Sequence, residues 1–252
     1  EEKKIDNFES NLISAVYYLE DKNFKNALLY LKKLEDKNQP GTIQNLLSTS
    51  LNAWTSFTNI PNLSTGLNNL EKIPERFKNI KDIQKTFAYC YFDSAKADEM
   101  FEQLTSNSDF SYSRYNFFHS NYLISKNKIK KAKEVINTSL KKNPRNLILN
   151  QLKLDLENKK LSNNKFDCKN LAHVIAEILY VASNALALQN NYIVSNFYLN
   201  LAKYLNPNFA SFHSLYAENL YYIEEYEVAK KTYIEIKKKG AAYNWYASKQ
   251  IA

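Results

Sequence analysis

The sequence predicts an all-α protein built from stacked helical hairpins, and three observations support this fold class. Apolar residues recur at spacings of three and four along most of the chain, as in segment 8–19, and sustained alternation with period two is missing. The 252 residues include only 3 glycines and 5 prolines, and the prolines fall between amphipathic runs. A pattern of small and large apolar residues repeats at a spacing of 34. Together they predict about fourteen helices joined by short turns.

The N-terminal part is predicted to be a series of hairpins with the same packing positions. Small residues are needed where two helices cross closely, and large apolar residues fill the space between hairpins. The first hairpin is indicated by these residues: Ala15, Tyr18, Phe24, Ala27 and Leu31. Two degenerate hairpins follow, around 54–73 and 80–104, with Gly66 and Ala97 at the small position. Segment 113–146 repeats the scheme clearly.

The middle of the chain breaks the repeat. Residues 147–156 are predicted to form a lone helix, and residues 157–170 are polar, without periodicity, and long for a hairpin turn. This segment is either a joint that lets the two halves move or an insertion packed rigidly against the helices. The chain is therefore divided into three parts, 1–145, 146–170 and 171–252.

The C-terminal part contains the clearest repeats. Segments 176–209 and 210–243 superimpose at the positions that matter for packing. The matched pairs are Ser183 with Ala217, Leu186 with Leu220, Tyr192 with Tyr226, Ser195 with Ala229, and Leu199 with Tyr233. Another first helix is predicted to begin near Trp245.

At these positions the sequence resembles the tetratricopeptide repeat family. The shared unit has small residues at its eighth and twentieth positions, an aromatic residue near the seventeenth and proline at the thirty-second. The resemblance covers most of 5–145 and 171–252, and it implies a right-handed α-solenoid. Taken whole, the chain is also similar to a section of longer bacterial multi-repeat proteins. Met100 is its only methionine, so we expect a processed product or a piece of a longer protein.

The composition excludes several kinds of site. No apolar run approaches the ~20 residues that a transmembrane helix needs. The glycines Gly41, Gly66 and Gly240 are too far apart for a phosphate-binding loop, so no nucleotide cofactor is expected. Cys90 and Cys168 lie 78 positions apart without a CxxC motif, and the sequence therefore indicates neither a disulfide framework nor a metal site.

The sequence also predicts that the protein is not an enzyme. His119, His173 and His213 lie in different predicted helices, and no HExxH or GxSxG motif is present. A structural role is therefore expected for each histidine. Cys168 precedes His173 by five positions, which does not place the two side chains on one helical face as a thiol nucleophile and its base would require.

The family resemblance implies a concave groove lined by the first helix of each hairpin. The residues that it places there are Arg114, Phe117, Asn121, Tyr180, Asn184, Leu188, Ser211, Glu218, Tyr221 and Tyr222. Asn121 and Asn184 both fall at the ninth repeat position, where an amide can bond to the backbone of an extended peptide. The fifth position lacks the Lys or Arg of the clamp that binds acidic tails, because it holds Phe117, Tyr180 and Ser214.

The formal net charge of +8 is confined to one stretch. The net charges of 1–74, 75–126, 127–170 and 171–252 are −1, 0, +8 and +1. The basic strip is predicted on the convex wall, with Lys128, Lys130, Lys131, Lys133, Lys141, Lys142 and Arg145. It is either a solvated helix face or a surface for an acidic protein, anionic lipid head groups or nucleic acid.

The sequence thus predicts a non-enzymatic scaffold that binds a peptide or helix of another protein in its groove. The alternative is an adaptor that binds an anionic surface through 127–170. Nucleic acid is disfavoured because the strip has one Arg and, besides Phe166, no aromatic residue for stacking. Membrane contact and the oligomeric state stay open. The resemblance to longer bacterial proteins favours export over the cytoplasm.

Overall fold

The computed structural model describes residues 6–35, 39, 41–59, 61–106, 113–160 and 166–252, and in these ranges the protein is all-α. The first nine helices form what we call the first stack. They are α1 (Phe8–Glu20), α2 (Phe24–Glu35), α3 (Ile43–Asn59), α4 (Leu63–Glu71), α5 (Lys78–Tyr91), α6 (Ala97–Ser106), α7 (Ser113–Ser125), α8 (Ile129–Lys142) and α9 (Leu147–Glu157), with a short 3-10 helix at Glu75–Phe77. The all-α prediction is confirmed for this part.

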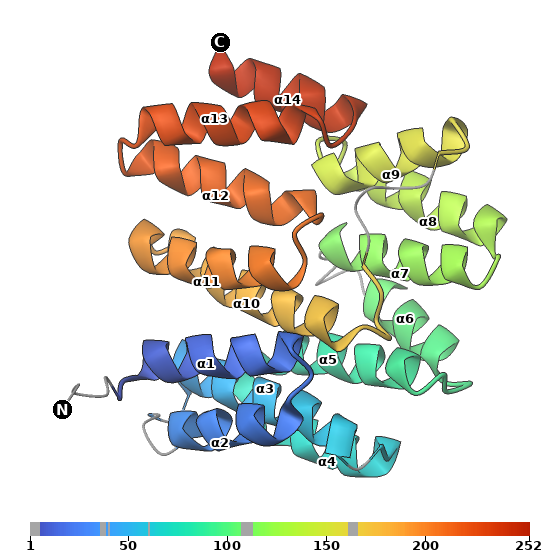
Figure 1. Cartoon of the computed structure of the whole chain (residues 1–252). Coiled ribbons are helices and arrows are strands. Elements are labelled where there is room, and N and C mark those ends of the chain that lie inside the picture. The colour runs from blue at the N-terminus through green and yellow to red at the C-terminus, as the bar shows by residue number, and fades with distance from the viewer. Residues whose placement is uncertain (1–5, 36–38, 40, 60, 107–112, 161–165) are drawn as a thin grey trace.

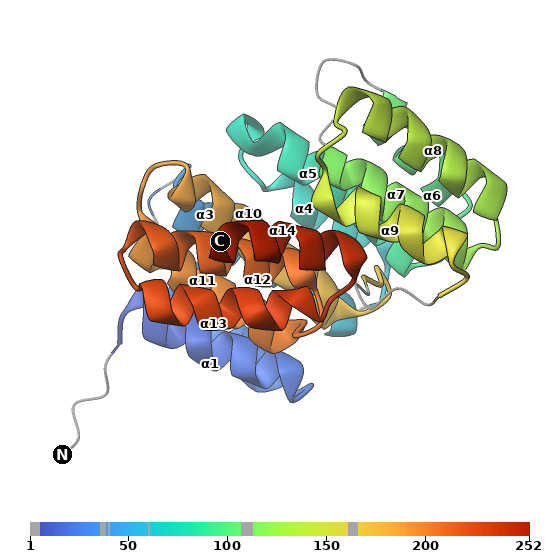
Figure 2. The same ribbon diagram turned by 90° about the horizontal axis from the view of Figure 1, so that it is seen from above.

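The second stack consists of the last five helices. They are α10 (Leu171–Ala187), α11 (Tyr192–Leu205), α12 (Ala210–Tyr222), α13 (Tyr226–Lys237) and α14 (Ala241–Ile251). This stack does not start on top of α9. Figure 1 shows that the chain returns to the base of the molecule, where α10 packs on α3 and α11 on α1. The stack then rises beside the first one until α14 packs against α9, and the view from above in Figure 2 agrees.

Asparagine side chains fix the start of several helices. Asn7, Asn62, Asn146 and Asn170 each accept a hydrogen bond from a backbone N–H in the first turn of the helix that follows. Such a cap satisfies one of the donors that a helix N-terminus leaves free and contributes about 1 kcal/mol. The asparagine-rich composition therefore has a local structural use.

The hairpin turns share one backbone conformation. Lys22, Asp93, Asn127, Asn190 and Glu224 all have φ between 52° and 64°. In each turn the next N–H bonds to the carbonyl five residues earlier, as in Asn23 to Tyr18 at 2.8 Å. This is the Schellman pattern that ends a helix and reverses the chain. Its recurrence shows that the α1–α2, α5–α6, α7–α8, α10–α11 and α12–α13 hairpins are closed in the same way.

The small residues of the repeat lie at the helix crossings, as predicted. Ser183 and Ser195 are fully buried and their hydroxyls are 2.8 Å apart, and Ala217 and Ala229 are buried in the next hairpin. Gly66 lies against Phe57 so closely that a Cβ at this position would come within 1.3 Å of the ring. These residues allow the helix axes to approach, because a larger side chain would hold them apart.

The segment that joins the two stacks corrects the prediction for the cysteines. Cys90 at the end of α5 and Cys168 form a disulfide, with their Cα atoms 6.0 Å apart. Phe166 packs between Phe87, Phe118 and Phe209, with ring centroids 4.4 to 6.5 Å apart. Residues 166–170 are thus held against the first stack. Residues 161–165 lie outside the described ranges.

The far end of the second stack packs against α9 and is hydrogen-bonded to it. Gln151 on α9 accepts a hydrogen bond from the N–H of Ala242 at 2.9 Å and donates one to Asp155 at 2.7 Å. Gly240, with φ of 137°, brings the backbone to Gln151 so closely that a Cβ would lie 2.3 Å from its amide. A glycine is therefore required at this turn. Among the described helices, none is both long and apolar enough to cross a membrane.

Candidate functional site

A cleft of about 850 Å³ lies between the two stacks, and we call it the interstack cleft. Side chains from α7 and α9 line one wall, and side chains from α10, α12 and α14 line the other. Six of the ten residues predicted to line the groove surround it: Arg114, Tyr180, Asn184, Leu188, Ser211 and Glu218. The volume is within the range of ligand-binding pockets. Residues from separate repeats are therefore brought together at one concave place.

The wall of the cleft contains a buried ion pair that joins the two stacks. Arg114 on α7 donates through Nε and Nη2 to the two carboxylate oxygens of Glu177 on α10, both at 2.6 Å. The guanidinium lies 3.9 Å from the centre of the Tyr180 ring and 5.2 Å from that of Phe209. Burial alone would lower the pKa of Arg114, but the negative charge of Glu177 and its hydrogen bonds act in the opposite direction, and the pKa of Arg114 is raised. Burial raises the pKa of Glu177, and the charge and hydrogen bonds of Arg114 oppose this shift. Each group of the pair thus supplies the hydrogen bonds that the other needs.

Glu218 on α12 is the second acidic group of the cleft region and has no such partner. Its carboxylate accepts a hydrogen bond from Tyr246 Oη on α14. None of the ion pairs among the described residues includes Glu218. Burial raises the pKa of Glu218, and the hydrogen bond from Tyr246 opposes this only in part. The cleft therefore contains a half-buried carboxyl group that has no cationic partner among the described residues.

The mouth of the cleft carries large apolar side chains. Leu188 is 79% exposed and Trp245 is 70% exposed, whereas Asn184, which also lines the cleft, is half-buried. Arg145, the last residue of the predicted basic strip, also lines the cleft. Exposed apolar residues around a concave polar centre are typical of a protein-binding surface.

Four predicted groove residues lie elsewhere. The prediction for Phe117 is wrong, because its ring is fully buried against Phe118 and Phe209 and is out of reach of a partner. Asn121 faces the joining segment and donates to the carbonyl of Phe166 at 3.2 Å. Tyr221 and Tyr222 lie at the α12–α13 turn, away from the interstack cleft.

These two tyrosines belong to an exposed cluster. Tyr222 stacks on Tyr192 with ring centroids 4.9 Å apart, and Tyr221 lies edge-on to Tyr222 and to Tyr226. The matched repeat positions of Tyr192 and Tyr226 explain why the rings meet at neighbouring turns. The rings support one another and form a surface patch, not part of the cleft.

The predicted basic strip is partly neutralised by α6. Lys128 pairs with Asp98, and Lys131 pairs with Glu102. The hydrogen bond from Lys128 lowers the pKa of Asp98 below its usual value. The other α8 lysines of the strip, Lys130, Lys133, Lys141 and Lys142, are exposed and take part in none of the ion pairs found among the described residues. The excess charge on this face is therefore smaller than the sequence predicts.

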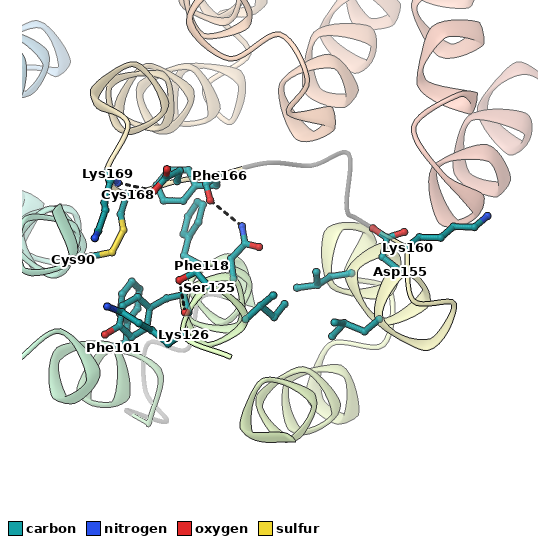
Figure 3. Close-up of a pocket in the computed structure, with 16 residues that line it drawn as sticks. Cys90, Phe101, Phe118, Ser125, Lys126, Asp155, Lys160, Phe166, Cys168 and Lys169 are labelled. Carbon is teal, nitrogen blue, oxygen red and sulfur yellow. Dashed lines mark hydrogen bonds between the residues drawn. A yellow bond between two sulfur atoms is a disulfide. The ribbon is translucent and has the colours of Figure 1, made fainter. Parts of the chain in front are cut away.

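A second pocket, of about 490 Å³, lies beside the Cys90–Cys168 disulfide. Figure 3 shows Phe118 and Phe166 near the disulfide and Asp155 with Lys160 at the opposite side. Lys126 and Lys169 both pair with Asp93, at 2.6 and 3.3 Å. Sequence reasoning missed this pocket, because it depends on the return of residues 166–170 to α5.

Each histidine lies in its own environment. His119 is buried, its Nδ1 is 2.9 Å from Thr105 Oγ1, and its ring stacks on Phe101. His173 Nδ1 accepts from the N–H of Asp167 at 3.1 Å, and His213 Nε2 lies 2.8 Å from the carbonyl of Pro207. Cys168, in the disulfide, is no free thiol for His173. In the part of the chain that the structure describes, no group of three or more His, Cys, Asp or Glu residues is arranged to hold a metal ion.

Comparison with known protein families yields no match, and comparison with curated proteins yields no significant match either. The resemblance to tetratricopeptide repeats therefore rests on the residue positions described above.

Proposed function

We propose that this chain is a protein-interaction scaffold without enzymatic activity, built as a solenoid of tetratricopeptide-like hairpins, and that it binds a peptide or helix of another protein in the interstack cleft. The observation that carries the proposal is the gathering of six predicted groove residues around one cleft. They come from α7, α10 and α12, which are first helices of separate hairpins.

The cleft suits a peptide because its walls are fixed before binding. The Arg114–Glu177 pair joins α7 to α10, and Gln151 joins α9 to the start of α14. A preformed site loses little conformational entropy when a partner binds. Asn184, Ser211 and Ser214 supply side-chain hydrogen-bonding groups, and Leu188 and Trp245 supply apolar area at the mouth.

Peptide selection tests this proposal. A random twelve-residue library is displayed and selected on the purified chain, and the enriched peptides are measured against variants by calorimetry. Asn184→Ala combined with Leu188→Ser is expected to weaken binding at least tenfold. The matched control, Tyr221→Ser with Tyr222→Ser in the exposed cluster, is expected to bind as the parent chain does. Peptides that bind equally to the cleft variant contradict the proposal.

The alternative is an adaptor for an anionic surface, and the exposed lysines of α8 favour it. Four of them lie on one helix and are free of ion pairs within the described ranges. Replacing Lys130, Lys133, Lys141 and Lys142 by Glu would then abolish binding to vesicles of 30% phosphatidylserine, or to an acidic polypeptide such as polyglutamate. Retained binding in this variant would exclude the adaptor.

We further infer that the protein works in an oxidising compartment, which supports export over the cytoplasm. The support is the Cys90–Cys168 disulfide, whose two half-cystines are buried. Disulfides form and persist outside the reducing cytosol. Thiol labelling of the denatured protein, taken directly from its source cells, tests this inference. Full labelling of both cysteines would contradict it.

A further inference from the structure

Glu218 is the feature of the interstack cleft that most needs a partner. Its carboxylate lines the cleft and receives one hydrogen bond, from Tyr246 Oη. A carboxylate removed from water is stable only when hydrogen bonds or an opposite charge replace the lost hydration. Glu177 on α10 receives hydrogen bonds and an opposite charge from Arg114. Glu218 has neither a Lys nor an Arg partner among the described residues.

Aromatic side chains surround this carboxylate. Tyr246 contacts it directly. Burial raises the pKa values of Tyr180 and Tyr233, and the charge of Glu218 adds to both shifts. Trp245 lines the same cleft and is largely exposed. Aromatic faces with a carboxylate nearby attract a cation through the ring quadrupole and the opposite charge. The surroundings of Glu218 thus favour a positive group.

The other charges of the cleft do not already supply this positive group. Arg114 is engaged by Glu177, and Arg145 is at the α8–α9 turn on the opposite wall. Lys249 approaches the ring of Trp245, with Nζ 5.8 Å from its centroid, and forms no ion pair with Glu218. The Lys249 contact shows that the Trp245 face can accept an ammonium group.

We propose that the interstack cleft binds a cationic group, an ammonium or guanidinium, that pairs with Glu218 beside Tyr246 and Trp245. This inference rests on the proposed function and names the partner's chemistry: the bound peptide anchors itself with a Lys or Arg side chain. The same chemistry is offered by a free alkylamine, so the test separates the two sources.

The test uses defined probes and the whole chain. The pentapeptide acetyl-Ala-Ala-Lys-Ala-Ala-amide is compared with its norleucine and glutamate counterparts, and butylammonium is compared with butanol. Binding is followed by the NMR shift of the Trp245 indole N–H. The lysine peptide is expected to shift this signal with at least tenfold higher affinity than the norleucine peptide, and the glutamate peptide is expected to leave it unchanged.

Two variants assign the effect to Glu218. Glu218→Gln keeps an oxygen that accepts from Tyr246 and is expected to lower the affinity for the lysine peptide at least tenfold. Glu235→Gln, an exposed position that pairs with Lys238 on α13, is the matched control and is expected to change nothing. Equal binding of lysine and norleucine peptides overturns the cationic anchor and leaves the proposed function standing.

Three further results of these binding experiments would also decide the inference. Binding of butylammonium without binding of the lysine peptide keeps the cation site and overturns the peptide as its source. A Glu218→Gln chain that retains the parent's melting temperature and affinity overturns the inference. Absence of any shift up to millimolar probe overturns it as well, whereas the proposed function is judged by the selected library peptides.

Discussion

The first stack buries most of its large apolar side chains, whereas the second stack leaves many exposed. In the described part of the first stack, Ile13, Tyr17 and Leu29 are the large apolar residues that are well exposed. The second stack exposes these: Leu188, Ile193, Tyr204, Tyr221, Tyr222, Tyr226, Val228, Ile234 and Trp245. Single exposed apolar residues are ordinary, but their concentration on one part marks an interaction surface. The second stack therefore exposes more large apolar side chains than the first.

The disulfide provides the largest expected contrast between the two parts. Replacing Cys90 and Cys168 by Ala removes a crosslink between residues 78 positions apart and is expected to destabilise the fold by about 4.5 kcal/mol, because the unfolded chain gains freedom. Urea unfolding with and without the crosslink measures this. Peptide binding to the cleft is expected to persist where the variant is folded. An unchanged unfolding midpoint would contradict the crosslink as a stabilising element.

The ion pair between Arg114 and Glu177 is expected to give the second-largest loss of stability. Arg114→Met leaves the carboxyl group of Glu177 buried without its partner and is expected to cost about 4 kcal/mol. The double variant Arg114→Met with Glu177→Leu is expected to recover most of this loss, since no unpaired charge remains. A double-mutant cycle of urea unfolding measures the coupling. A coupling energy near zero would show that the pair does not hold the stacks together.

Acidification tests the first stack through His119. Burial lowers the pKa of His119 to about 4, below its ordinary value of 6.5, with Lys131 adding to this effect. Between pH 6.5 and pH 4 the imidazole of His119 is protonated in the unfolded chain but neutral in the folded chain. The free energy of unfolding therefore decreases as the pH falls from 6.5 toward 4. The loss reaches about 3 kcal/mol. His119→Gln is expected to remove this part of the pH dependence, and an unaltered profile would contradict it.

The helix caps give the smallest effect. Asn146→Ala removes the cap of α9 and the hydrogen bond to Ser113 and is expected to cost about 1 kcal/mol in the first stack. Asn170→Ala removes the cap of α10 at the start of the second stack and serves as the matched comparison. Hydrogen exchange of the first turns localises each loss. Fraying at both helices in either variant would contradict independent caps.

Local patterns predicted the helices, their turns and the small residues at the crossings, because helix periodicity and packing at repeat positions are properties of neighbouring residues. The packing of α10 on α3 could not be predicted from local patterns, because it depends on contacts between segments that are distant in the sequence. The disulfide depends on the same return, which brings Cys168 to Cys90.

The site shows the same division. Six of the predicted groove residues lie around the interstack cleft, and their role in binding a partner stays a prediction. The prediction that Phe117 lines the groove was wrong, because Phe209 from the second stack packs against its ring. Tyr246, which donates to Glu218, lies on α14, outside the repeat segments that were compared, so no repeat position indicated it.

Hydrogen exchange of the chain with and without a selected peptide tests whether a partner binds between the stacks. Amide protection is expected to increase in α10, α12 and α14 along the interstack cleft. Protection confined to α8, or to the turn that carries Tyr221 and Tyr222, with an unchanged cleft, would contradict it.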